Sequence, residues 1–276
     1  MSNIKPDLNH VLATAKKAAL LAGDKIAELR RTNNFSVSSK ANAYDLVTTA
    51  DLEAEKIIVD LIKKAYSDHL ILSEESYQNL SPDLIKEKNV WIIDPIDGTV
   101  NYAHGLLNVC VCIGFAHKGE VLAGVVYAPF LNETFEAIKG QGATLNAQKI
   151  SCSSIQELKK SVVSTGFPYE REGLFPILLG NVEAILKTCN GIRRAGAAGI
   201  DLCWVACGRL EAHFEITLKP WDVAAANLIA REAGAITGFM NGFFNEEDMP
   251  KDLRSTNTLV AAPGIYEKLK SIIKGI

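Results

Sequence analysis

Apolar residues recur every three or four positions in two long stretches near the start of the chain. The first stretch covers 9–31 and the second covers 51–66. This spacing is typical of amphipathic helices that pack one face on a core. The second stretch also has acidic residues in its first turn and lysines in its last, where the charges complement the helix dipole. We therefore predict two long helices at the amino end.

Continuous apolar runs follow these helices and predict buried strands. Two runs lie at 69–73 and 90–94, with a polar loop and one helical turn expected between them at 76–88. Two further runs, 109–117 and 121–129, are separated by a short polar turn and predict a hairpin. Because strands covered on both faces are apolar throughout, we expect the hairpin at the centre of a sheet.

The second half of the chain alternates strand-like and helix-like segments. Residues 140–149 are rich in glycine and predict a loop. We expect strands at 161–165, 211–216, 235–236 and 258–262, and helices at 173–187, 197–208, 222–233 and 264–273. Strands and helices alternate in groups, which favours a layered α/β or α+β fold.

Composition narrows the class of protein. The chain has 276 residues, 48% of them hydrophobic, enough to bury a large core as one domain or two closely joined ones. Its net charge is −3 and no basic run exceeds two residues, so we expect no nucleic-acid partner. The first residues lack the apolar core of a signal peptide. The longest apolar run, 106–116, is shorter than the roughly 18 residues of a membrane span, so we expect a soluble, cytoplasmic protein.

Cysteine and histidine spacing argues against a zinc site. Cys110 and Cys112 would share one face of a strand, and Cys203 and Cys207 one face of a helix. The chain has no CxxC pair, and its five histidines form no HxH or HxxxH pair. We interpret the cysteines as small core residues.

The most informative motif follows the strand predicted at 90–94. There an apolar run ends in two carboxylates, Asp94 and Asp97, and a threonine, Thr99. Ligands of open α/β sheets bind outside the carboxyl ends of strands, and carboxylates suit Mg²⁺. The amides of Gly98 and Thr99 could receive a phosphate oxygen. A capped type I turn is the alternative, whereas an EF-hand is excluded because its end positions would not be acidic.

Other acids also lie where elements end. Glu74 follows a predicted strand, and Asp51 and Asp222 begin predicted helices, although Asp51 could serve only as a cap. A cluster of such carboxylates is costly unless cations bind to it. Two divalent ions about 3.5–4 Å apart could hold the attacking and leaving oxygens of a phosphoryl transfer. In such a site Asp51 and Thr99 would position the water.

Four motifs resemble those of the inositol monophosphatase family of Mg²⁺-dependent, lithium-sensitive phosphatases. They are DLVTTAD from Asp45, SEES from Ser73, WIIDPIDGTVNY from Trp91 and WDVAA from Trp221. They occur in the family's order and extend over most of the chain. The resemblance implies an αβαβα five-layer sandwich in a single domain, 1–276, with an N-terminal part of about 1–150 and a C-terminal part of about 151–276. It also implies a cytoplasmic homodimer that hydrolyses a phosphate monoester with metal-activated water.

The resemblance also implies a role for each matching residue. One Mg²⁺ would be bound by Glu74, Asp94 and the carbonyl of Ile96, a second by Asp94, Asp97 and Asp222, and a third, weaker ion near Glu74. The catalytic residues would be Asp51, Thr99 and Glu74, with the first two activating the water. Gly98 and Thr99 would hold the phosphate, and Gly196, Ala197, Ala198 and Glu215 the alcohol. Glu215 could instead only pair with a basic neighbour, and we interpret Glu75 as mainly structural.

The sequence says less about the alcohol part of the substrate than about the phosphate chemistry. Ala197 lies where many relatives have serine or threonine, so a hydroxyl contact is missing. We take myo-inositol 1-phosphate as the leading substrate. Histidinol phosphate, fructose 1,6-bisphosphate and 3′-phosphoadenosine 5′-phosphate are the alternatives, and segments 169–175 and 193–198 should set the choice. A non-catalytic regulatory binding protein on the same fold is the hypothesis from another class.

Overall fold

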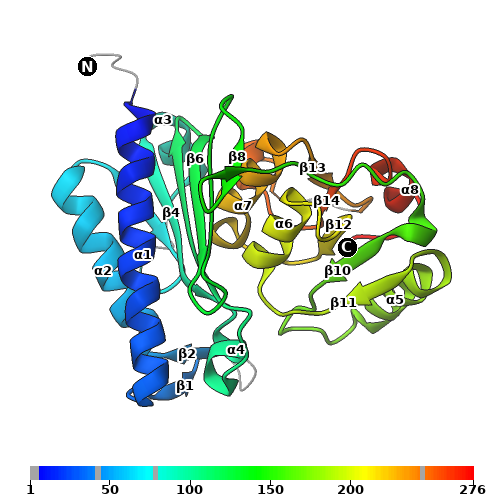
Figure 1. Cartoon of the computed structure of the whole chain (residues 1–276), viewed down its shortest axis with the longest axis horizontal. Helices are drawn as coiled ribbons and strands as arrows, with labels where there is room; N and C mark the ends of the chain where they lie inside the picture. The colour runs from blue at the N-terminus through cyan, green and yellow to red at the C-terminus, as the bar shows by residue number, and fades with distance from the viewer. Residues whose placement is uncertain (1–5, 41–44, 77–79, 243–245) are drawn as a thin grey trace.

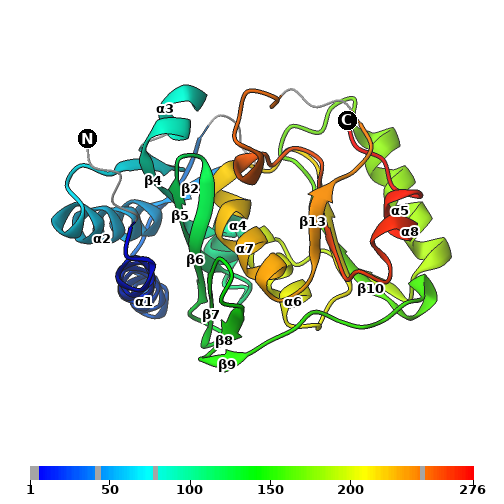
Figure 2. The same cartoon turned by 90° about the horizontal axis from the view of Figure 1, so that it is seen from above.

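Helices and sheets alternate in five layers, as Figures 1 and 2 show. The computed structural model describes residues 6–40, 45–76, 80–242 and 246–276. The layers are a helix pair, a seven-stranded sheet, a second helix pair, a five-stranded sheet and a third helix pair. This arrangement confirms the αβαβα sandwich. None of the helices in the described ranges is long and apolar enough to cross a membrane.

The first layer consists of α1 (Leu8–Thr32) and α2 (Thr49–Ala65). Both were predicted, but α2 begins two residues earlier than expected because Thr48 is its N-cap. The Thr48 side chain accepts a hydrogen bond from the amide of Ala50. Buried apolar faces of both helices pack on the seven-stranded sheet.

The seven-stranded sheet has the order β3-β4-β5-β6-β7-β8-β9. Its strands are β3 (Leu70–Ser73), β4 (Asn89–Asp97), β5 (Cys110–His117), β6 (Glu120–Ala128), β7 (Glu133–Ile138), β8 (Ala143–Leu145) and β9 (Gln148–Lys149). The predicted hairpin is confirmed as β5 and β6, near the centre. The loop predicted at 140–149 is wrong in part, because residues 143–145 and 148–149 pair as β8 and β9, joined by a turn at Asn146 and Ala147.

The middle helices α6 (Ala198–Ala206) and α7 (Pro220–Glu232) lie between the two sheets. Their small residues allow close packing on both sides. A Cβ on Gly124 of β6 would come within 2.9 Å of the Ala225 carbonyl, so glycine lets α7 approach the sheet. This packing fixes the start of α7 beside the end of β4.

The five-stranded sheet has the order β11-β10-β12-β14-β13 and is covered on its outer side by α5 and α8. Its elements are β10 (Val162–Thr165), α5 (Phe175–Thr188), β11 (Gly191–Arg193), β12 (Ala212–Glu215), β13 (Ile236–Phe239), β14 (Thr258–Ala261) and α8 (Tyr266–Lys270). The final helix is shorter than predicted because the chain turns to pair Lys274 with Asn241.

Several short elements complete the fold, and all but one of these short strands and helices were not predicted. The strands β1 (Val37–Ser39) and β2 (Leu46–Thr48) form a two-stranded ribbon whose first strand is exposed throughout. The helix α4 (Thr99–His104) follows β4 directly, and α3 (Pro82–Glu87) is the helical turn expected between the first two strands. Two short 3₁₀ turns, Leu158–Lys160 and Lys251–Leu253, complete the described elements.

Candidate active site

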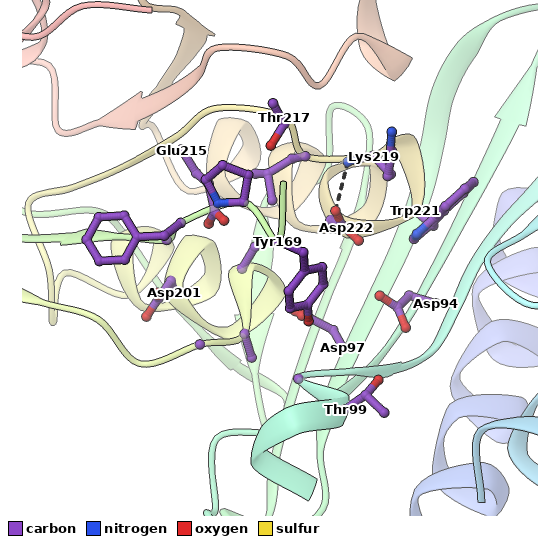
Figure 3. A pocket seen from close by; sticks show the side chains of 18 of the residues that line it. Asp94, Asp97, Thr99, Tyr169, Asp201, Glu215, Thr217, Lys219, Trp221 and Asp222 are labelled. Atoms are coloured by element: carbon purple, nitrogen blue, oxygen red, sulfur yellow. Dashed lines mark hydrogen bonds between the residues drawn. The ribbon is translucent and has the colours of Figure 1, made fainter. Parts of the chain in front are cut away.

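A cavity of about 620 Å³ lies where β3, β4, β10 and β12 end and where α4, α6 and α7 begin. All the predicted site residues line it except Asp51, which is fully buried behind Thr99. Figure 3 shows Asp94, Asp97 and Asp222 on one side of this cavity and Asp201 and Glu215 on the other. The sequence motifs therefore do converge in space.

Glu74 and Asp94 lie together because β3 and β4 are parallel neighbours. The register pairs Ser73 with Ile93, so the acid that follows each of these residues lies at the same edge. The Glu74 amide also donates to the Ile93 carbonyl at 3.2 Å. Both acids thus occupy the carboxyl ends of parallel strands, where α/β proteins gather their ligands.

Asp97 lies at the end of β4, where the pairing with β5 is irregular. The register pairs Asp94 with Cys112 and Asp97 with Cys110, so β4 has one residue more than β5 between these pairs. Such a bulge re-aims the side chains of the strand that carries it. Asp97 Oδ2 accepts the Gly199 amide at 2.6 Å and lies 3.5 Å from Cys110 Sγ. The first turn of α6 is thereby tied to the end of β4.

Asp222 enters the cavity from the first turn of α7. Its Oδ2 accepts the Lys219 amide at 2.8 Å, so it also acts as a helix cap. Four acids from β3, β4 and α7 therefore meet at one end of the cavity, which we call the acidic end.

Burial and mutual repulsion raise the pKa values of the acids at the acidic end. Burial raises the pKa of Glu74 and of Asp97 to about 7, and that of Asp222 to about 8. Burial also raises the pKa of Asp94 well above its usual value, and the charges of Glu74, Asp97 and Asp222 add to the effect. A bound cation would remove this repulsion. Four ionised carboxylates without a cation are therefore unfavourable at the acidic end, and a bound divalent ion would stabilise them.

Lys40 is a neighbour of this end that the sequence did not reveal. Its Nζ lies 2.6 Å from Glu74 Oε1 and 2.7 Å from Glu75 Oε1. Burial lowers the pKa of Lys40, but the charges of Glu74 and Glu75 outweigh it and raise the pKa above its usual value. Lys40 directly follows the unpredicted strand β1, whose three residues carry no periodic signal. Glu75 thus forms an ion pair with Lys40, which agrees with a mainly structural role for Glu75.

Asp51 and Thr99 form a buried pair behind the acidic end. Asp51 Oδ2 accepts both the amide and the hydroxyl of Thr48, so the predicted helix cap is present. Its other oxygen, Oδ1, lies 3.2 Å from the Thr99 hydroxyl, which also lies 3.1 Å from the Ile96 carbonyl. Burial raises the pKa of Asp51. Asp51 therefore serves as a cap and also reaches the cavity through Thr99.

Two glycine turns bring backbone close to the cavity. Gly98 has φ 94° and Gly196 has φ 90°, conformations that side chains rarely adopt. A Cβ on Gly98 would lie 2.8 Å from the Asn108 carbonyl and 3.2 Å from Ala197. Gly98 precedes α4 and Gly196 precedes α6, so both turns position helix starts beside the acids.

The other end of the cavity, which we call the alcohol end because the family resemblance implies that the alcohol binds there, contains Glu215, Asp201 and a buried histidine. Glu215 ends β12, and its Oε2 lies 3.5 Å from His213 Nε2. Glu215 therefore does have the basic neighbour that the alternative interpretation required. Asp201, His213 and the cavity-lining Tyr169, Arg194 and Trp221 were not assigned from sequence, although the segments containing Tyr169 and Arg194 were expected to set specificity.

The cysteines are free in the described parts of the chain. Cys110, Cys112 and Cys203 are buried, as predicted for small core residues, whereas Cys152, Cys189 and Cys207 are only partly covered. Cys110 Sγ lies 3.6 Å from Cys112 Sγ, and both lie close to Asp97. Burial raises the pKa of the Cys110 thiol, which keeps it protonated and uncharged beside that acid.

Comparison with known proteins supports the family resemblance over almost the whole chain. The sequence pattern of the inositol monophosphatase family matches residues 7–274. A relative in Pasteurella multocida, named Nus factor SuhB, is 35% identical over 97% of both proteins. The crystal structure of the extragenic suppressor protein suhB from Bartonella henselae superposes with a TM-score of 0.84 at 33% identity, over 95% of this chain and 98% of that one. An inositol monophosphatase from Anabaena gives 0.80 at 32% identity, over 97% and 96%.

Proposed function

The chain belongs to the inositol monophosphatase family, and from this premise we propose that it hydrolyses a small polyol phosphate monoester in a Mg²⁺-dependent reaction. Myo-inositol 1-phosphate is the leading substrate. The observation that carries the proposal is the convergence of Glu74, Asp94, Asp97 and Asp222 beside Thr99 at one end of a cavity of about 620 Å³. This volume lies within the range of small-molecule sites.

The acidic end fits divalent cations. Its donors are carboxylates and a backbone carbonyl, which are hard oxygen ligands suited to Mg²⁺. Glu74, Asp94 and the Ile96 carbonyl would hold one ion, and Asp94, Asp97 and Asp222 a second, with a third near Glu74. The raised pKa values of Asp97 and Asp222 support this, because such acids become stable carboxylates once a cation is bound. Bound ions would supply charge neutralisation for the phosphate and a more acidic water.

Thr99 and Asp51 are placed to orient the attacking water. When the Thr99 hydroxyl donates to Asp51 Oδ1, its lone pairs face the cavity and can accept a hydrogen bond from water. A proton taken up by Thr99 can pass to Asp51, because burial raises the pKa of that carboxyl. Thr48 holds Asp51 from the opposite side, so this pair is fixed before the substrate binds.

Backbone amides would hold the phosphate. The amides at the start of α4, after Gly98, have no acceptor within the helix and lie at the acidic end. Gly196, Ala197, Ala198 and Glu215 would contact the alcohol. Since Ala197 has no hydroxyl, the neighbouring segments 169–175 and 193–198 would choose among the polyol phosphates and the alternatives histidinol phosphate, fructose 1,6-bisphosphate and 3′-phosphoadenosine 5′-phosphate. Lithium sensitivity, a homodimer, a cytoplasmic location and the lack of a nucleic-acid partner remain predictions.

A second candidate function is a non-catalytic role in association with other macromolecules. It is favoured by the name of the Pasteurella multocida relative, Nus factor SuhB, which is not the name of an enzyme. A protein with this role would work without turnover, and the site acids would serve structure alone.

One assay separates the two candidates. Purified protein is given each of the four phosphate esters with and without Mg²⁺, and released phosphate is measured for the natural chain and for Asp94→Asn. We expect Mg²⁺-dependent release from inositol 1-phosphate by the natural chain only. If no ester is hydrolysed although the folded protein binds Mg²⁺, the phosphatase proposal is wrong and the binding role is favoured.

A further inference from the structure

A fully buried histidine, His213, connects the two strands beneath the alcohol end. The parallel strands β10 and β12 pair Ser164 with His213. Because of this register, Ser164 Oγ lies 2.9 Å from His213 Nδ1. Asp201 Oδ2, from α6, approaches the same nitrogen at 3.6 Å. The imidazole ring is therefore held at one nitrogen by partners from two elements.

The other nitrogen of His213 faces Glu215. The distance from Nε2 to Glu215 Oε2 is 3.5 Å, and Nε2 is buried without any closer hydrogen-bond partner. When the Ser164 hydroxyl donates to Nδ1, the proton of the neutral ring is on Nε2 and points at the Glu215 carboxylate. A buried N–H without a full hydrogen bond is costly, so this contact should tighten whenever Glu215 is anionic.

Glycine makes room for the same carboxylate. Gly166 follows β10, and a Cβ placed on it would lie 2.1 Å from the carboxylate atoms of Glu215. Any larger residue at 166 would thus displace Glu215. The carboxylate is seated between the Gly166 backbone on one side and His213 on the other, while its side chain remains 14% exposed to the cavity.

Acidic groups on this side of the cavity favour a hydrogen-bond donor. Asp201 lines the cavity behind Glu215, and its Oδ1 is buried without a partner. Burial raises the pKa of Asp201 to about 7, and the neighbouring Glu215 adds to this rise while His213 opposes it. Arg194 and Lys219 also line the cavity, and the Arg194 guanidinium lies 5.9 Å from the centre of the Phe167 ring. The alcohol end therefore offers acceptors from Asp201 and Glu215, in a cavity that these two basic side chains also line.

We propose that His213 is a positioning residue which, held by Ser164 and Asp201, orients Glu215 to accept a hydroxyl of the alcohol and so makes the site selective for polyol monophosphates. This inference rests on the proposed phosphatase function. A carboxylate accepts hydrogen bonds from hydroxyl groups and repels a second phosphate. Esters whose alcohol carries another anion, such as fructose 1,6-bisphosphate, should therefore be disfavoured by the alcohol end.

Two amide substitutions separate the two nitrogens of His213. The side-chain amide nitrogen of glutamine in His213→Gln takes the place of Nε2. The amide nitrogen of asparagine in His213→Asn takes the place of Nδ1, so this variant leaves the position of Nε2 empty. The probes are inositol 1-phosphate and 4-nitrophenyl phosphate, whose alcohol has no further hydroxyl, both assayed with Mg²⁺. We expect His213→Asn to raise KM for inositol 1-phosphate about tenfold with little change in kcat, because a contact common to ground and transition states is lost. His213→Gln should stay within about threefold of the natural chain.

Hydrolysis of 4-nitrophenyl phosphate serves as the internal control. Both variants should keep its kcat/KM, and His213→Asn should narrow the preference for inositol 1-phosphate over fructose 1,6-bisphosphate. Equal losses on both monoesters in both variants, or an unchanged KM for inositol 1-phosphate in His213→Asn, would overturn the positioning role. If the natural chain hydrolyses neither monoester, the proposed function itself fails, and this result is distinct from the other two.

Discussion

The two ends of the cavity both contain buried acids, but they are balanced differently. In the described part of the chain no lysine or arginine forms an ion pair with Asp94, Asp97 or Asp222, and Lys40 reaches only Glu74 and Glu75. At the alcohol end, His213 lies between Asp201 and Glu215. The acids of the first end therefore repel one another unless they are protonated or a cation binds, whereas the ring nitrogens of His213 lie between the acids of the second end. The difference supports the proposal that one end binds metal and the other presents a hydrogen-bond acceptor.

Removing one carboxylate from the acidic end should have the largest effect. Asp94 contributes to both proposed ions, so Asp94→Asn should lower kcat/KM about a thousandfold or more on every ester. The same change removes a source of repulsion, so the metal-free protein should melt at an equal or higher temperature. Phosphate release and thermal melting measure the two effects. A variant that is inactive because it is unfolded would contradict this account of the acidic end.

Substitution of Thr99 should have the second-largest effect on activity, because Thr99 would orient the water without binding metal. Thr99→Val keeps the shape of the side chain but removes the hydroxyl, and kcat should fall about a hundredfold with KM little changed. Thr99→Ser keeps the hydroxyl bonded to Asp51 and should retain most activity. If valine and serine at this position behave alike in steady-state kinetics, the hydroxyl has no role in the reaction.

The stability of the metal-free protein should depend on pH through the acidic end. Glu74 and Asp97 have pKa values of about 7 and Asp222 of about 8, above the roughly 4 of unfolded chains. Their contribution to stability is complete below pH about 4 and is lost as the pH rises through these folded-state values. Mg²⁺ binds the ionised form, so it should raise the melting temperature more at pH 8 than at pH 5.5. An equal rise at both pH values would argue against these acids as the ligands.

Lys40 should have the smallest of these effects. Lys40→Met removes the partner of Glu74 and Glu75, and the melting temperature at pH 8 without metal should fall by about 2–6 °C, in line with the loss of one or two charge-assisted hydrogen bonds. Lys40→Arg, which keeps the charge, provides the matched control. A methionine variant as stable as the arginine variant would show that the ion pairs add little.

The acidic end could be predicted from sequence because its acids lie in short motifs beside recognisable strands. Once Leu70–Ser73 and Val90 onward are identified as buried strands, the parallel register brings Glu74 and Asp94 together, although β4 continues past the predicted end at Asp94 to Asp97. The long helices and the central hairpin were equally accessible, since each has a clear periodicity or a continuous apolar run. The glycine turn at Gly98 then places the start of α4 beside these acids.

Of the alcohol end, the family resemblance implied only Glu215 and residues 196–198, and the groups around them could not be predicted in this way. The contact between Ser164 and His213 depends on the register of two strands whose paired residues are 49 positions apart, which no local pattern records. Lys40 is placed by a ribbon of two three-residue strands, too short for periodicity to show. The strands β8 and β9 were missed because a glycine-rich turn dominates their sequence. Tertiary pairing determines all three features.

The most direct test of the central claim is Mg²⁺ binding and phosphate release measured on the same protein sample. The account predicts that the natural chain binds Mg²⁺ and releases phosphate from inositol 1-phosphate only when Mg²⁺ is present. It also predicts that Asp94→Asn loses tight binding and turnover together while staying folded. Phosphate release that continues undiminished in a chelator, or a variant that keeps full Mg²⁺ affinity, would contradict a metal site built from Glu74, Asp94, Asp97 and Asp222.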